Sequence, residues 1–260
     1  ARITGMDNAS HALSEQYRKQ AARKLGSNKL TLLRAAAAMF SKAAISNPLQ
    51  LTNHLRWLRV LISILRVLIR TGQRHNDPEL EVEFGRANLV LKDAMNLVVG
   101  NDEPPAEVLL LHSSLLRQTY FQHINLDASA MLPTCLKFWA KSYELLLASA
   151  KSKHVVHIGL NVQRKFERRK QKRWAELLLG LEHIIELKEV PRLSELIGVV
   201  VARDPELCRF LLASLNGPPC RKRIFCVLLT MLRAHGPSLE LLKAWITSTG
   251  TVEVAQLLIG

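Results

Sequence analysis

The sequence has few aromatic residues. Phe, Trp and Tyr make up 5% of its 260 residues, whereas hydrophobic residues as a whole make up 48%. A core built from this composition must be mainly aliphatic. Leu and Ala are strong helix formers, while aromatic and β-branched residues are enriched in strands. The composition therefore favours helices over sheets, and the length allows one large domain or two modest ones.

Cysteine is also scarce, and no apolar leader segment precedes the first predicted helix. None of the four cysteines forms a CxxC pair, so we expect buried thiols in a reducing compartment. The N-terminal stretch is polar and charged, unlike a signal peptide. Because the sequence begins with Ala1 rather than Met, removal of an organellar transit peptide and truncation both fit. The cysteines are Cys135, Cys208, Cys220 and Cys226.

Motifs that would indicate a reaction are absent. The sequence contains no GxGxxG, GxxxxGK[ST], HExxH, GxSxG or Glu-x-x-His pattern. His154 and His157, with His183 farther along, come nearest to a metal site, but they have no acidic or thiol partner nearby in sequence. We therefore predict a non-catalytic protein with no metal, cofactor or small-molecule substrate. An enzyme whose site is assembled from distant residues is an alternative.

Acidic residues are outnumbered. The chain has 36 Lys and Arg against 22 Asp and Glu, which gives a net charge of +14. The excess is concentrated in residues 1–80 and 161–180, and a further basic cluster begins at Arg221. A charge this large predicts an anionic partner: nucleic acid, anionic lipid or an acidic protein.

Helix start and stop signals recur along the whole chain, with caps, prolines and glycines at most joints. They predict an all-α fold of about ten to twelve helices, packed as a helical bundle or an irregular α-solenoid (helical repeat) without significant sheet. A strand candidate at 155–162 has no partner strand. We expect longer helices in residues 1–150 and short ones in 151–260, packed together as one unit. The long helices are predicted at 10–25, 28–45, 48–70, 78–100, 105–124 and 127–151.

The predicted helix at 48–70 is apolar on most of its faces, but it carries four arginines. Arg56, Arg59, Arg66 and Arg70 fall within a narrow arc at 100° per residue. Four charges are too many for a helix that crosses a bilayer. We predict a buried helix with one cationic edge, and an interfacial membrane helix is the alternative.

The segment QRKFERRKQKRW, residues 163–174, is the most basic part of the chain. On a helical wheel six cations share one half, while Phe166 and Trp174 lie on the other half. Lys170 intrudes on the aromatic side, where its long stem would let the ammonium snorkel outward. Like charges one turn apart repel, and an anionic partner would remove that repulsion. We predict that the cations face outward and contact phosphate; a solvated or acidic-protein-facing surface is the alternative. The six are Arg164, Lys165, Arg168, Arg169, Lys172 and Arg173.

Two further patches support a polyanion partner. One begins a predicted helix, where a bound phosphate would offset the repulsion between cations and the helix dipole. The other forms a basic face on the first predicted helix. The candidate phosphate-binding residues of these patches are Arg221, Lys222, Arg223, Arg18, Lys19, Arg23 and Lys24.

The sequence shows no zinc fingers, homeodomain, basic zipper or ribonucleoprotein aromatics. This profile predicts a structural or RNA-binding subunit of a ribonucleoprotein particle, such as a mitochondrial ribosomal protein. It would bind phosphate backbone by shape and neighbouring proteins through apolar helices. We expect a mitochondrial location, or otherwise a cytoplasmic or nuclear one. A helical adaptor or scaffold in a multiprotein complex and a peripheral membrane protein are the alternatives.

Overall fold

The computed structural model is all-α in the parts of the chain that it describes, which confirms the predicted fold class. The described residues are 12–13, 15–20, 27–71, 77–99, 103–124, 128–156, 158, 166–174, 176 and 206. No strand occurs within these ranges, and none of the helices in them is long and apolar enough to cross a membrane. The predicted number of helices concerns the whole chain and stays a prediction.

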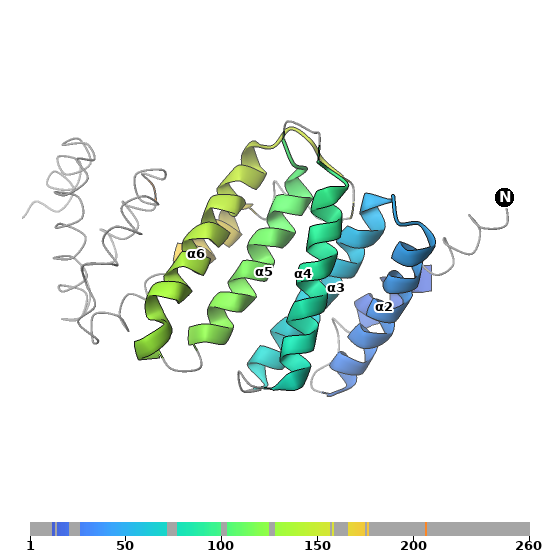
Figure 1. Cartoon of the computed structure of the whole chain (residues 1–260), viewed down its shortest axis with the longest axis horizontal. Coiled ribbons are helices and arrows are strands. Elements are labelled where there is room, and N and C mark those ends of the chain that lie inside the picture. Colours follow the sequence, from blue (N-terminus) through green and yellow to red (C-terminus); the bar gives the residue numbers. More distant parts are fainter. Residues whose placement is uncertain are drawn as a thin grey trace, which may run out of the picture. The chain divides into compact units, whose positions relative to one another are not determined.

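The chain divides into two compact units. The first contains residues 1–126 and 141–167, and the second contains residues 127–140 and 168–260. Helices α2 to α5 belong to the first unit, and each runs opposite to the one before it, as short connections require (Figure 1). The fifth labelled helix, α6, contributes residues to both units. The bounds are α2 Ser27–Ser46, α3 Leu51–Arg70, α4 Pro78–Asn96, α5 Ala106–Ile124 and α6 Ala128–Lys151.

Helix α3 is the centre of the first unit, because it packs against α2, α4 and α5. Its aliphatic side chains lie on most of its faces, so three neighbouring helices are needed to cover them. Leu55, Leu58 and Leu65 are fully buried, and most of the remaining aliphatic residues of α3 are buried with them. Phe40 of α2 and Leu115 of α5 join the same core. The core is thus mainly aliphatic, as the composition predicts.

The start of α4 follows the predicted capping pattern. Asp77 has an extended backbone, and its Oδ1 accepts a hydrogen bond from the backbone N–H of Glu79 at 2.9 Å. Pro78 occupies the first helical position, where its missing N–H has no intrahelical partner to lose. Glu79 also forms an ion pair with Arg34 of α2. The Asp77 cap, Pro78 and the ion pair to α2 therefore fix the position at which α4 begins.

The predicted start of α3 at Pro48 is wrong, because α3 begins at Leu51. The backbone N–H of Gln50 donates to the Asn47 carbonyl at 3.1 Å, which closes a turn with Pro48 at its second position. The fixed φ of proline suits that turn position as well as the first position of a helix. Asn53 then ties the turn to α2 by donating to the Ala43 carbonyl at 3.1 Å.

Two buried serines join α5 to the second half of α6. Ser113 Oγ donates to the Ser142 carbonyl at 2.5 Å, and Ser142 Oγ donates to the Ser113 carbonyl at 2.8 Å. Small side chains let the two backbones approach closely, and each hydroxyl finds an acceptor on the other helix. These reciprocal bonds satisfy polar groups that would otherwise be buried without partners.

The β-branched residues of the 155–162 segment form no strand where the structure describes them. Instead the chain passes along the start of α5. The backbone N–H of Ala106 donates to the His154 carbonyl at 2.9 Å, and the N–H of Val156 donates to Glu107 Oε2 at 2.7 Å. The apolar side chain of Val156 packs against the core of the first unit. Burial against helices therefore accounts for Val156 and Ile158 without a sheet, whereas Val155 is exposed.

Truncating a core leucine of α3 tests whether this helix supports the unit. Leu65 is 0% exposed, so we expect Leu65→Ala to lower the free energy of unfolding by about 2 to 5 kcal/mol, from lost burial and the cavity left behind. Chemical denaturation measures the change. Leu89→Ala on α4 is the matched control, because Leu89 is 60% exposed and its loss should change stability by less than about 0.5 kcal/mol. Equal effects of the two substitutions would contradict a central role for α3.

The cap of α4 gives a second prediction. Asp77→Ala removes the acceptor for the Glu79 N–H, and we expect a loss of about 1 kcal/mol of stability. Asp77→Asn is the control, since its side-chain oxygen still accepts that bond and it should stay near the stability of the wild type. Thermal unfolding of the three proteins compares them. An alanine variant as stable as the asparagine variant would show that the cap contributes nothing.

Candidate nucleic-acid interface

The basic helix keeps part of its predicted orientation. Residues 166–174 and 176 are helical, and Arg164 and Lys165 lie outside the described residues. Arg168 and Lys172 are exposed, and their spacing of four residues puts them on one face of the helix. Trp174 is buried, as predicted. Phe166 is only half-buried.

The predicted outward position of Arg173 is wrong. Its side chain is buried, with the residue only 5% exposed, and its Nη1 lies 3.4 Å from Glu176 Oε2, which is also buried. The carbonyl of the same residue accepts a hydrogen bond from Trp139 Nε1 at 3.1 Å. Position 173 borders the aromatic side of the wheel, and the buried face is wider than the aromatic residues alone indicate. Glu176, three residues on, supplies the carboxylate that makes this burial tolerable.

Lys170 does not snorkel to solvent. It is 6% exposed, forms an ion pair with Glu206, and its Nζ lies 5.1 Å from the centre of the Trp174 ring. A cation over an indole face is stabilised by the negative charge of that face. The sequence pattern does not reveal this arrangement, because the carboxylate lies 36 residues away along the chain.

Arg169 lies between the exposed and buried faces. It is half-buried, its Nη1 makes no hydrogen bond, and burial lowers the pKa of its guanidinium. The described part of the basic helix therefore has two clearly exposed cations, Arg168 and Lys172. Its other cations are partly or fully withdrawn from solvent, and two of them pair with carboxylates.

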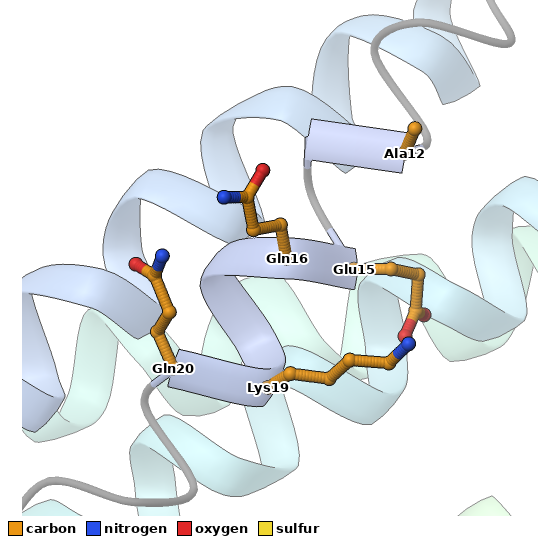
Figure 2. Close-up of a pocket in the computed structure, with 5 residues that line it drawn as sticks. All are labelled: Ala12, Glu15, Gln16, Lys19 and Gln20. Atoms are coloured by element: carbon orange, nitrogen blue, oxygen red, sulfur yellow. The ribbon is translucent and has the colours of Figure 1, made fainter.

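The N-terminal basic patch is partly neutralised where it is described. Residues 12–13 and 15–20 are helical; Lys19 is exposed, and Arg18 forms an ion pair with Glu15 at 2.6 Å. A cavity of about 490 Å³ lies along one face of this helix, where the side chains of Glu15 and Lys19 point toward one another (Figure 2). Arg23, Lys24, Arg221, Lys222 and Arg223 lie outside the described residues, so their phosphate contacts stay predictions.

Metal chemistry gains no support from the described residues, which contain no cluster of three His, Cys, Asp or Glu side chains able to hold an ion. His154 is exposed and engages α5 through its backbone carbonyl. His157 and His183 lie outside the described residues. His112 on α5 has a pKa lowered by burial and, to a lesser degree, by Lys141.

Sequence reasoning missed the cations of α2. Arg34 and Lys42 are exposed on one side of this helix, with Ala38 between them, and α2 contains no acidic residue. The sequence feature that could have indicated these cations is a long stretch without acidic residues. From position 16 to position 76 the chain has twelve Lys and Arg but no Asp or Glu.

Comparisons with known proteins found no similarity. No family model matches the chain, and no curated protein or solved structure matches it significantly.

Measurements of the free energy of unfolding can test which cations of the basic helix are buried and which are exposed. Arg173→Gln removes the buried guanidinium that lies 3.4 Å from the Glu176 carboxylate, and we expect the free energy of unfolding to fall by about 3 kcal/mol. Arg168→Gln, five residues earlier on the exposed face, should change it by less than about 0.5 kcal/mol. Urea denaturation distinguishes the two. Equal stability of both variants would mean that Arg173 is not buried in solution.

Proposed function

We propose that this protein is a non-catalytic RNA-binding subunit of a ribonucleoprotein particle. One observation carries the proposal. Arg168 and Lys172 are exposed on one face of a helix whose opposite side is anchored by Trp174 and by the Lys170–Glu206 pair. An anchored helix holds its cations at fixed spacing, so they bind a charged backbone with little loss of conformational freedom.

Phosphate is the anion that suits these groups best. A guanidinium presents a planar fork of donors that matches two phosphate oxygens, and an ammonium acts as a point charge. The buried aromatic residue, Trp174, is not available to stack on bases. Binding of this kind reads the backbone and the shape of RNA, with little reading of sequence.

A subunit of a particle also needs surfaces for protein neighbours. The outer face of α4 carries two exposed apolar side chains, Val82 and Leu89, with Gly85 between them. A Cβ added at Gly85 would have no atom of another element within 4 Å, so α4 is uncovered at this position. Exposed aliphatic side chains of this kind fit the proposed role in an assembly, and a mitochondrial ribosome is the particle we favour.

Removal of the two exposed cations tests the proposed function. We expect Arg168→Gln with Lys172→Gln to weaken binding to a generic single-stranded RNA. The slope of log affinity against log salt should decrease by about 1.4, since each lost phosphate contact contributes about 0.7. Fluorescence anisotropy over a series of salt concentrations measures both quantities.

The matched control is Lys92→Gln with Lys153→Gln, which removes the same charge from two exposed positions elsewhere. This control should lose much less affinity. Similar losses in the two double variants would show that net charge, and not the basic helix, controls binding. Absence of RNA binding by the wild type at moderate salt would refute the proposal outright, and retention of proteins alone after nuclease treatment would favour the adaptor.

A further inference from the structure

The central helix α3 lies in a part of the chain that has no carboxylates of its own. Between Glu15 and Asp77 the sequence has no Asp or Glu. Lys and Arg residues in this span can therefore pair only with carboxylates from elsewhere, as Arg34 does with Glu79. Like charges in such a segment repel one another, so an external anion would stabilise it.

The four arginines of α3 share one edge of the helix. Arg56, Arg59 and Arg66 are half-buried and Arg70 is exposed, whereas most of the other side chains of α3 are buried. Ser63 lies on the same arc and is also half-buried. The arginine edge, defined as Arg56, Arg59, Arg66 and Arg70, is therefore the least buried side of α3.

The arginine edge forms a long strip of cations that is held in place by the fold. Its ends are fourteen positions apart in the sequence, which corresponds to roughly 21 Å along the helix axis. Arg59 Nη1 donates to the Ile158 carbonyl at 2.9 Å, and Ile158 is itself buried in the core. The strip is thus built on a buried helix and fixed to the segment that follows α6.

We propose that the arginine edge of α3 binds the phosphate backbone of a single-stranded segment of RNA. The identity of the polyanion rests on the proposed function, but the site is separate from the basic helix and belongs to the other unit. A narrow cationic strip that follows one backbone is the arrangement by which proteins hold single strands without reading sequence.

The half-buried position of Arg56, Arg59 and Arg66 favours a strand over a flat anionic surface. Side chains that protrude can meet the wide face of a duplex or a bilayer together, whereas recessed ones are reached best by a thin chain. Arginine also retains its charge when partly desolvated and holds phosphate in a bidentate manner. An acidic peptide has the same thinness, so the test includes one.

The test uses the full chain with Arg56→Gln and Arg70→Gln combined, because within the described residues the structure shows no hydrogen bond or ion pair of either side chain. The probes are oligouridine of about 20 nucleotides, duplex RNA, polyglutamate, and vesicles containing phosphatidylserine. We expect at least a roughly tenfold loss of oligouridine affinity near 0.1 M salt. The Lys92→Gln, Lys153→Gln double variant should lose much less.

A second measurement does not depend on folding of a variant. In the wild-type protein, oligouridine should protect Arg56 and Arg70 from an arginine-modifying reagent. Arg86 on α4, which is exposed, should remain reactive and serves as the internal control.

Each outcome supports the inference or overturns it. Loss of oligouridine affinity together with protection supports it. Unchanged affinity and no protection, while Arg168→Gln with Lys172→Gln still weakens binding, would overturn this site and leave the proposed function standing. Tighter binding of duplex, polyglutamate or vesicles than of oligouridine, with the same dependence on Arg56 and Arg70, would also overturn it.

Discussion

Burial of α3 is the constraint on which the first unit depends. A 20-residue helix with aliphatic side chains on most of its faces is stable in water only when other helices cover those faces. Packing against α2, α4 and α5 provides that cover. The same requirement decides where the arginines of α3 can lie, since a guanidinium must keep contact with solvent or with a hydrogen-bond acceptor. One partly open edge is the result, and Arg59 on it reaches the Ile158 carbonyl.

The cost of removing a charge from water also decides which cations of the basic helix can be buried. A buried charge is tolerated only with a partner, and Arg173 has Glu176 while Lys170 has Glu206. The charge count of the sequence therefore overstates the charge available for binding. Two of the cations counted there help to hold the helix in its unit. Among the described cations of this helix, Arg168 and Lys172 are the exposed ones.

Features with a local cause were predictable from the sequence. Asp77 and Pro78 start α4 as expected, because the cap and the proline act within a single turn. Pro48 misled the prediction, because the same residue fits a turn as well as a helix start, and the choice depends on contacts between helices. A helical wheel could not predict that Arg173 is buried, because its burial also depends on contacts between helices. A wheel ranks faces by hydrophobicity, and it does not contain Trp139, which donates to the Arg173 carbonyl from another helix.

The two cationic surfaces lie in different units, and their side chains differ in exposure to solvent. Exposed cations on the basic helix are hydrated, so any contribution of theirs to binding would be mainly electrostatic and should weaken with salt. The half-buried arginines of α3 have already lost part of their hydration on folding, and the acid-free sequence around them supplies no local carboxylate. A phosphate that reaches them would meet donors that are partly desolvated and fixed in place, which strengthens each hydrogen bond. If RNA binds at both surfaces, the α3 edge should therefore contribute more affinity per charge, and the basic helix more of the salt dependence.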